Sequence, residues 1–399
     1  MSEITIGDGK PGLSSTATLE STITVMDYGA IGDGKTDDSK AFLSAWEAAC
    51  SNTGTPTVAV PSGKSFLISQ AEFQGPCQAS NITFQILGAI IAPTKQQWTS
   101  NFEGWIRFTG VNGLHIAGNG QGSFNGQGQS WWSNTGDKRP SAIRFSKCDN
   151  LKVTGLKHEN SQKNHLSVTN CNHAEISGLE MTAPDSSPNT DGIDISSSTY
   201  IIITNCTFKT GDDCIAINGG CSNVHVSDVN CGPGHGISIG SLGENGEHEE
   251  VETISVDKCN FYGTTNGARI KTWQGGSGFA RNINFTNLNF TETENPVIID
   301  QFYCPEHNCP PNNPAVKISD VQFRGLYGTS SCKTPTINIK CSEKEPCTNI
   351  QLEDVNIKSA DPKCSATAEC INTIGTIAHT SSPLVNCSTP STWQKPTTF

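Results

Sequence analysis

Short pairs of apolar residues recur along most of the chain with a constant internal spacing. Apolar residues occupy positions i, i+2, i+5 and i+7 of a unit that repeats every 23 to 34 residues. Because alternate residues of a strand point to one face, each pair predicts a short strand, and the step from i+2 to i+5 predicts a bend between two strands. The units are Leu151, Val153, Leu156 and, more weakly, His158; Ala174, Ile176, Leu179 and Met181; Ile201, Ile203, Cys206 and Phe208; Val224, Val226, Val229 and Cys231; Ile254, Val256, Cys259 and Phe261; Ile283, Phe285, Leu288 and Phe290; Val316, Ile318, Val321 and Phe323; Ile350, Leu352, Val355 and Ile357.

A stack of such units predicts an all-β chain folded as a parallel β-helix, in which each coil buries its apolar side chains only against its neighbours. Only 34% of the residues are hydrophobic and 39 are glycine, which is typical of a narrow interior with many turns. An antiparallel sandwich also has short strands and frequent turns. Hairpin signals such as Asn-Gly between matched strands are scarce, however, and the repeats are longer than sandwich spacing. The pattern therefore favours the β-helix.

The repeats run without an evident linker, so a single domain is expected although 399 residues would ordinarily suggest two. A solenoid escapes that limit because it grows along one axis. We predict a flexible leader over residues 1–24, one β-helix domain over 25–375, and a tail rich in Ser, Thr and Pro over 376–399.

The clearest helix is predicted over Thr36–Cys50, ahead of the first coil. Thr36 or Asp37 can cap its N-terminus, acidic residues lie in its first turn, and apolar residues recur at helical spacing. The apolar stripe consists of Ala41, Phe42, Ala45, Trp46 and Ala49. A helix in this place would cover the otherwise open end of the core.

Seventeen cysteines are more than a cytosolic chain of this length needs as free thiols. Several are closely spaced, such as Cys304/Cys309, Cys341/Cys347 and Cys364/Cys370, and the odd count leaves at least one thiol unpaired in a monomer. Cys304 and Cys309 predict a disulfide rather than a metal site, because a second Cys/His pair at matching spacing is lacking. N-glycosylation sequons begin at Asn81, Asn205, Asn284, Asn289 and Asn386. These features indicate an oxidising, secreted environment.

Charge and hydropathy narrow the range of partners. The formal net charge is −12, and no run of Lys and Arg is present, so a nucleic-acid partner is not expected. No apolar run reaches the roughly 18 residues of a membrane span. The first ten residues show neither a basic nor an apolar signal-peptide region, so the expectation of secretion rests on the cysteines and sequons.

Four short polar clusters lie at or beside the start of four predicted strands. They are NTDG at 189–192, GDDC at 211–214, GHG at 234–236 and RIK at 269–271, and the strands carry Ile193/Ile195, Ile215/Ile217, Ile237/Ile239 and Ala268/Ile270. Aligning the strands places Asp191, Asp213, His235 and Asn266 at one equivalent position, with steps of 22 residues between the first three. If each step is one coil, three carboxylates, an imidazole and two cations meet on one face.

This cluster has the composition of a site for glycoside hydrolysis. Neighbouring parallel strands lie roughly 4.8 Å apart, so Asp191 and Asp213 would approach to about that distance, with Asp212 beside them. Like charges this close cannot all ionise freely, so at least one carboxyl should keep its proton near neutral pH. A protonated acid that faces ionised carboxylates is what glycosidases use. Arg269 and Lys271 project to the same outward side, and their charges suit the carboxylates of a uronic acid polymer.

Each of these residues also has an ordinary structural interpretation. An Asp at a strand entry often bonds its own backbone, and His235 between two glycines could be a residue of a tight bend. Arg269 could pair with a surface Asp. The adjacent Asp212 and Asp213 are unusual in a turn, because nothing there offsets their repulsion. The coincidence of all these residues at one ladder position favours a functional site.

The four motifs in this order resemble the polygalacturonases of glycoside hydrolase family 28, and the plant members in particular. The resemblance extends through VMDYGAIGDGKTDD at 25–38, GSFNGQGQSWW at 122–132, CGPGHGISIGSLG at 231–243, RIKTWQGGSG at 269–278 and NPVIIDQFYC at 295–304. It covers residues 24 to 375, nearly the whole chain. Asn125 and Ala268 depart from the residues that relatives often carry, and neither belongs to the proposed chemistry.

The resemblance implies a right-handed parallel β-helix that hydrolyses α-1,4-galacturonosyl linkages of pectin with inversion and needs no metal or other cofactor. It implies that Asp212 is the general acid, that Asp191 and Asp213 position and activate water, and that His235 tunes the protonation of the acid. A carboxyl separation of about 5 Å would by itself favour retention, so inversion rests on the resemblance alone.

The resemblance further implies that Arg269, Lys271 and Tyr303 bind galacturonate around the scissile bond. It implies a disulfide between Cys214 and Cys231, which would tie the Asp coil to the His coil. The enzyme would be a monomer that acts outside the cell or in the cell wall on polygalacturonate. The crowded acids and the extracellular placement predict a mildly acidic optimum. The loop Gly275–Gly278 resembles members that cut internally, which favours endo action. The complete set of His235, Arg269 and Lys271 favours unesterified homogalacturonan as the substrate.

Two other functions stay open at this point. A pectate lyase would also be a β-helix, with Asp191, Asp212 and Asp213 holding calcium and Arg269 acting as the base. That interpretation leaves His235 and its flanking glycines unexplained. The second alternative is a non-catalytic β-helix that binds pectin.

Overall fold

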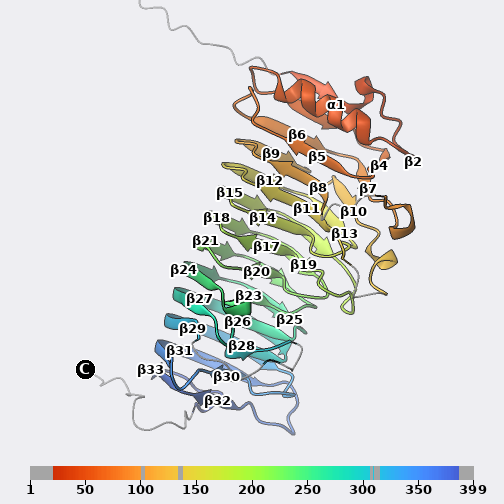
Figure 1. The fold of residues 1–399 in the computed structure, drawn as a ribbon. Helices are drawn as coiled ribbons and strands as arrows, with labels where there is room; N and C mark the ends of the chain where they lie inside the picture. The colour runs from red at the N-terminus through yellow and green to blue at the C-terminus, as the bar shows by residue number, and fades with distance from the viewer. Residues whose placement is uncertain (1–20, 100–103, 134–137, 306–308, 310–314, 386–399) are drawn as a thin grey trace, which may run out of the picture.

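The chain winds into a right-handed parallel β-helix, in which the strands of successive coils stack along one axis (Figure 1). The computed structural model describes residues 21–99, 104–133, 138–305, 309 and 315–385. Within this part of the chain the predicted fold class is confirmed. None of its helices is long and apolar enough to cross a membrane.

One face of the β-helix is a sheet of 11 parallel strands, and this face carries the polar clusters. The strands are β5 (Ala71–Gln74), β8 (Gly104–Thr109), β11 (Ser141–Ser146), β14 (Leu166–Thr169), β17 (Ile193–Ser196), β20 (Ile215–Ile217), β23 (Ile237–Leu242), β26 (Asn266–Trp273), β28 (Asn295–Tyr303), β30 (Ile337–Lys340) and β32 (Ala368–Ile371). Each strand pairs with the next in this order.

The remaining faces form a second sheet of 22 strands. These are β1 (Thr22–Thr24), β2 (Asp33–Asp37), β3 (Thr57–Val60), β4 (Ser65–Leu67), β6 (Ile82–Ile86), β7 (Ala89–Ile91), β9 (Leu114–Ala117), β10 (Ser123–Asn125), β12 (Leu151–Thr154), β13 (Lys157–Glu159), β15 (Asn172–Ser177), β16 (Glu180–Thr182), β18 (Thr199–Thr204), β19 (Thr207–Lys209), β21 (Cys221–Ser227), β22 (Asn230–Cys231), β24 (His248–Asp257), β25 (Asn260–Tyr262), β27 (Ser277–Thr293), β29 (Lys317–Ser330), β31 (Cys347–Ser359) and β33 (Thr373–Ala378). Short 3₁₀ helices are η1 (Val25–Tyr28), η2 (Lys95–Gln97), η3 (Gly128–Ser130) and η4 (Glu244–Gly246).

The predicted repeat unit is the inner lining of this second sheet. Ile176, Ile203, Val226 and Val256 pair in series across β15, β18, β21 and β24, and all four are buried. The predicted bend follows each i, i+2 pair at a residue in the left-handed conformation, such as Asn205 with a φ of 52°. A short polar side chain such as Asn tolerates that conformation, which explains why Asn and Gly crowd these places.

The frame predicted for the seventh unit was wrong. Val321 and Phe323, rather than Val316 and Ile318, lie opposite Ile283 and Phe285. The last position of the true frame is Gly328, which pairs with Phe290 and has a φ of 123°. A Cβ there would lie 2.0 Å from the carbonyl oxygen of Phe290, so the apolar side chain that completes other units is replaced by glycine.

The predicted capping helix is present as α1 (Ser39–Cys50), and it covers the N-terminal end of the core (Figure 1). Its Trp46 packs edge-on against Phe73 and Phe108, at 5.5 and 5.7 Å between ring centroids. The N-cap residue is Asp38, where Thr36 or Asp37 had been expected, and the first turn holds no acidic residue. The Asp38 carboxylate accepts the amides of Ile31 and Gly32 and thereby fixes the loop before the helix.

Among the described residues, the first strand begins at Thr22, inside the range predicted as a leader, and Thr22–Thr24 pairs with β3. At the other end, β33 continues to Ala378, past the predicted domain boundary at 375. Residues 1–20 and 386–399 of the predicted leader and tail lie outside the described residues.

Five disulfides are present among the described cysteines. They join Cys50 to Cys77, Cys214 to Cys231, Cys304 to Cys309, Cys332 to Cys364, and Cys341 to Cys347. The pair implied by the resemblance, Cys214–Cys231, is therefore confirmed. Cys364 bonds a cysteine on another coil, not its sequence neighbour Cys370. Five buried cysteines stay as free thiols: Cys148, Cys171, Cys206, Cys221 and Cys259.

Candidate active site

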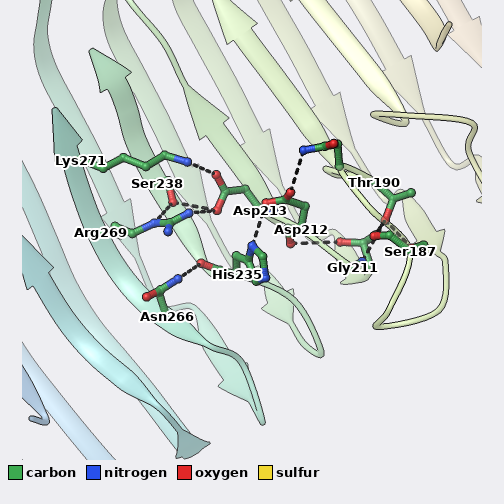
Figure 2. A network of polar contacts seen from close by, with 12 residues as sticks. Ser187, Thr190, Gly211, Asp212, Asp213, His235, Ser238, Asn266, Arg269 and Lys271 are labelled. Atoms are coloured by element: carbon green, nitrogen blue, oxygen red, sulfur yellow. Dashed lines mark hydrogen bonds and ion pairs between the residues drawn. The ribbon is translucent and has the colours of Figure 1, made fainter. Parts of the chain in front are cut away.

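The register of the 11-stranded sheet brings the four polar clusters together as predicted. Ile193 pairs with Ile215, Ile215 with Ile237, and Ile237 with Ala268. Because these partners lie side by side, the residues before them stand in one ladder across β17, β20, β23 and β26. The cluster thus depends on in-register stacking and not on a shared loop (Figure 2).

Short polar contacts hold the turns that carry the cluster. The Thr190 hydroxyl accepts the Gly211 amide at 2.9 Å and lies 2.6 Å from the Ser187 hydroxyl, which fixes the 187–191 turn on the Asp212 turn. The Asn266 amide donates to the His235 carbonyl at 3.2 Å. Gly236 has a φ of 85°, and a Cβ there would lie 2.2 Å from the Asn266 carbonyl oxygen, so this approach requires glycine.

Asp213 is the buried centre of the site. Its side chain is 1% exposed, and its carboxylate receives both cations of the RIK motif. Lys271 Nζ lies 2.8 Å from Oδ2, while Arg269 Nη2 and the Ser238 hydroxyl donate to Oδ1. Arg269 Nε donates in turn to the Ser238 hydroxyl at 2.7 Å, so Ser238 joins the two charges (Figure 2). The sequence placed Arg269 and Lys271 on this face, but it did not reveal their pairing with Asp213.

Asp212 and His235 form the accessible edge of the site. The two side chains are 18% and 39% exposed, and Asp212 Oδ1 lies 2.8 Å from His235 Nδ1. The Asp213 amide also donates to Asp212 Oδ1 at 2.9 Å. A ligand that approaches the outer sheet face therefore meets Asp212 and His235 before it meets Asp213.

Burial and mutual repulsion separate the carboxyl groups by proton affinity. Burial, with repulsion from Asp194, Asp212 and Asp213, raises the pKa of Asp191 well above its usual value. Burial likewise raises the pKa of Asp194 to about 7. Burial acts in the same direction on Asp212, but the hydrogen bond and charge of His235, together with the charges of Lys271 and Arg269, outweigh it and lower the pKa of Asp212. The predicted rise in pKa therefore falls on Asp191 and Asp194, whereas the pKa of Asp212 is lowered.

Two further residues extend the site. Tyr303 was predicted to lie here, and its ring is 5.3 Å from Lys271 Nζ and 5.4 Å from the ring of Trp273. Asp194 was not among the site residues predicted from the sequence. It stands on the outward side of β17, between Ser167 and Ala216 of the adjacent strands. The alternation of Ile193 and Ile195 with Asp194 is the signal that would have placed its carboxyl on the functional face.

Potential metal ligands in this region are already neutralised in part. Donor atoms of Asp212, Asp213 and His235 lie within 4.8 Å of one another. Both oxygens of Asp213 are engaged by protein cations, however, and a calcium ion would have to compete with them. The donor set thus fits a network of hydrogen bonds and ion pairs better than a calcium site.

Fold and site together define a class of protein, a β-helical enzyme with carboxyl groups on an accessible outer sheet. The family model described as Glycosyl hydrolases family 28 matches residues 50–381. The chain belongs to this family, and it is a glycosidase. The alternatives of a calcium-dependent lyase and of a non-catalytic binding protein are not supported by this assignment.

Plant proteins are among the similar sequences. A probable polygalacturonase of Arabidopsis thaliana is 47% identical over 363 residues, which cover 90% of this chain and 79% of the relative. A polygalacturonase of Malus domestica is 40% identical over 365 residues, which cover 89% of this chain and 78% of the relative.

Solved structures agree with this assignment. The endo-xylogalacturonan hydrolase from Aspergillus tubingensis superposes with a TM-score of 0.76 at 26% identity, over 93% of this chain and all of the other. The polygalacturonase from Erwinia carotovora shares the fold with a TM-score of 0.71 at 21% identity, over 92% of this chain and 99% of the other.

Proposed function

We propose that this glycosidase hydrolyses the α-1,4-galacturonosyl linkages of polygalacturonate. The observation that carries the proposal is the cluster of Asp212, Asp213 and His235 with Arg269 and Lys271 on one accessible sheet face. Carboxyl groups supply acid and base for glycosidic cleavage, and cations beside them suit a substrate with a carboxylate on each sugar. The names of the plant relatives support the same substrate.

In this proposal Asp212 protonates the leaving glycosidic oxygen, and Asp191 and Asp213 orient the attacking water with inversion. Asp212 suits the acid role because it is the accessible member of the Asp212/Asp213 pair. The Arg269 side chain is 12% exposed, and its Nη1 has no hydrogen-bond partner among the described residues. That atom is free to bind a galacturonate carboxylate, with Lys271 and Tyr303 beside it.

The pKa of Asp191 is raised and that of Asp212 is lowered in the unliganded protein, so Asp212 must gain a proton when substrate binds. A glycosidic oxygen within hydrogen-bond reach of Asp212 accepts a proton, and an acceptor favours the neutral form of a carboxyl group. Substrate binding thereby raises the pKa of Asp212 from its lowered value, while Asp191 becomes the ionised partner of the water. The proton moves within one coupled cluster of carboxyl groups.

Activity should peak below neutral pH. The direction of this pH dependence follows from Asp212. An acid with a lowered pKa loses its proton as the pH rises, and the reaction then stops. An optimum well above neutrality would contradict the assigned acid.

Further features of the enzyme belong to the same proposal. The sequons and five disulfides support secretion to the cell wall or extracellular space. Endo action and a monomeric state are proposed from the Gly275–Gly278 loop and from the capped end of the β-helix. No metal or other cofactor is assigned a role.

The test incubates the protein with de-esterified polygalacturonate at mildly acidic pH, with and without EDTA, beside an Asp212→Asn variant. Reducing ends should appear without an unsaturated product, independently of EDTA, and they should vanish in the variant. An early fall in viscosity would indicate endo action. Ultraviolet absorbance of an unsaturated product that disappears with EDTA would refute the hydrolase mechanism.

A further inference from the structure

Arg139 lies beside the acidic cluster but belongs to none of its four motifs. It precedes β11, and its guanidinium donates to the carbonyl oxygen of Gln162 at 3.1 Å, to that of Pro188, and to Oδ1 of Asn189 at 2.7 Å. Gln162 lies just before strand β14, and Asn189 lies just before strand β17. One side chain therefore joins three successive coils. Its charge also acts on Asp191 and Asp212.

The contact with Asn189 sets the orientation of an amide. A guanidinium has donors and no acceptor, so the Asn189 atom that faces Arg139 must be the oxygen. The Nδ2 group of Asn189 is then directed at Asp212, where it lies 3.3 Å from Oδ2. Asn189 has a φ of 51°, a left-handed conformation that asparagine tolerates.

This orientation matters for the proton of Asp212. Its Oδ1 is occupied by the Asp213 amide and by His235, so Oδ2 is the oxygen with room for an acidic proton. An amide nitrogen beside Oδ2 cannot accept that proton, which stays available to a glycosidic oxygen. A reversed amide would present its oxygen to Oδ2, accept the proton and hold it away from the substrate.

We propose that Arg139, acting through Asn189, is a positioning residue that keeps the proton of Asp212 available to the leaving group. The inference rests on the proposed function, because it presumes that Asp212 is the acid. Neither Arg139 nor Asn189 needs to touch the reacting atoms. The chain of contacts from Arg139 through Asn189 to Asp212 is called the relay below. Other charged groups also act on Asp212, and the relay adds to their effect. These groups are Asp191, Asp194, Asp213, His235, Arg269 and Lys271.

The test compares Arg139→Gln with Arg139→Lys. A Gln side chain has both a donor and an acceptor, so it permits either orientation of the Asn189 amide, whereas a Lys ammonium only donates. Arg139→Gln should lower kcat by about 10- to 100-fold, less than the roughly 10²- to 10⁴-fold that general acid catalysis contributes in full, because Asp212 itself is retained; KM should change little. On the basic side of its pH–rate profile, Arg139→Gln should lose activity at a higher pH than the wild type, because an acceptor beside Oδ2 favours the neutral carboxyl. Arg139→Lys should keep most of kcat and should lose activity at the same pH as the wild type.

A double-mutant cycle separates the relay from a general effect on the loop. If Arg139 acts through Asn189, the double variant Arg139→Gln/Asn189→Ala should be no slower than Asn189→Ala alone. Additive losses in kcat would overturn the inference. It would fail equally if Arg139→Lys were as slow as Arg139→Gln, or if the pH profile of Arg139→Gln matched that of the wild type.

Two controls keep the result interpretable. Thermal unfolding shows whether each variant is folded, and if Arg139→Gln does not fold, the kcat and pH profiles of Asn189→Ala and Arg139→Lys decide. Wild-type protein that releases no reducing ends from polygalacturonate would refute the proposed function. Active wild type with unaltered Asn189→Ala profiles would refute only the relay.

Discussion

At the scale of single residues, the site combines a buried charge with accessible ones. Asp213 is removed from water, and its charge is offset by Arg269 and Lys271. A buried ion network of this kind is costly to break, since removal of one partner leaves an uncompensated charge. The arrangement fixes the positions of both cations before substrate arrives.

Asp213→Asn should therefore destabilise the fold as well as inactivate the enzyme. The substitution keeps the shape of the side chain but leaves the buried Lys271 and the partly buried Arg269 without their counter-charge. We expect a loss of about 3–5 kcal/mol in the free energy of unfolding, measured by urea denaturation. Asp212→Asn, at the accessible edge, serves as the matched control and should lose much less. Equal stability of the two variants would contradict the buried ion network.

A buried pair of histidines lies one coil before Asp191, whose carbonyl oxygen accepts the His165 backbone amide. The rings of His158 and His165 are 4.5 Å apart, and their nitrogens have no hydrogen-bond partner among the described residues. Burial lowers the pKa of His158 to about 3, and burial lowers that of His165 as well. Both rings are neutral in the folded protein, so the unfolded chain binds protons first as the pH falls.

His158→Met should make the fold more resistant to acid. His158 lies between Phe124 and Met181 in one buried row, so methionine suits its surroundings. From about pH 6.5 down toward pH 3, each such histidine lowers the free energy of unfolding by about 1.4 kcal/mol per pH unit. The methionine variant lacks this pH-dependent cost at position 158. Unfolding curves of variant and wild type should converge near pH 7 and separate at pH 4. Parallel curves throughout would show that His158 is not buried in its neutral form.

At the scale of elements, the turns that enter the strands β17, β20 and β23 carry the chemistry. Their positions depend on side-chain contacts between turns, such as Thr190 with Gly211. The Cys214–Cys231 disulfide adds a covalent link between the residue after Asp213 and the strand before His235. It bridges residues 17 apart in sequence, so it also restricts the unfolded chain.

Removal of this disulfide by Cys214→Ala/Cys231→Ala should lower stability by about 3 kcal/mol from loop entropy alone. It should also reduce kcat, since Asp213 and His235 would lose a shared anchor. Cys341→Ala/Cys347→Ala is the control, because that pair is only 6 residues apart and lies away from the site. The control should lose about 1 kcal/mol less and keep its kcat, as measured by thermal unfolding and initial rates. A control that loses as much kcat would rule out the anchoring role.

At the scale of the whole molecule, the β-helix is an open-ended stack that needs a cover. Helix α1 supplies it at the N-terminal end through Phe42, Ala45 and Trp46, all of them buried. An uncovered end would expose apolar side chains and unpaired strand edges, and such edges recruit other chains.

Ala45→Asp should therefore cause both unfolding and self-association. Ala45 is fully buried, so an unpaired carboxylate there would lift α1 from the core. Light scattering after size exclusion should show a monomer for the wild type and larger species for the variant, with a lower Tm. The exposed neighbour Ser44→Asp is the control and should behave as the wild type. A monomeric Ala45→Asp protein of unchanged Tm would contradict the capping role.

Much of this architecture could be predicted from the sequence, because parallel in-register stacking is nearly one-dimensional. Steps of 22 residues with isoleucines at matching offsets convert directly into one ladder, so Asp191, Asp213 and His235 could be aligned without coordinates. The same rule failed at the seventh unit. Gly328 interrupts the apolar pattern there, and an incorrect frame fitted the sequence better.

The sequence by itself determined the fold, the face that carries the site and its principal residues, since these follow from the alternation of side chains along stacked strands. Only the tertiary structure decided which groups touch. It paired Asp213 with Arg269 and Lys271, raised the pKa of Asp191 while it lowered that of Asp212, joined Cys332 to Cys364, and brought Arg139 to the acidic cluster. Such contacts depend on the directions of side chains and the paths of loops between coils, for which sequence spacing holds no rule.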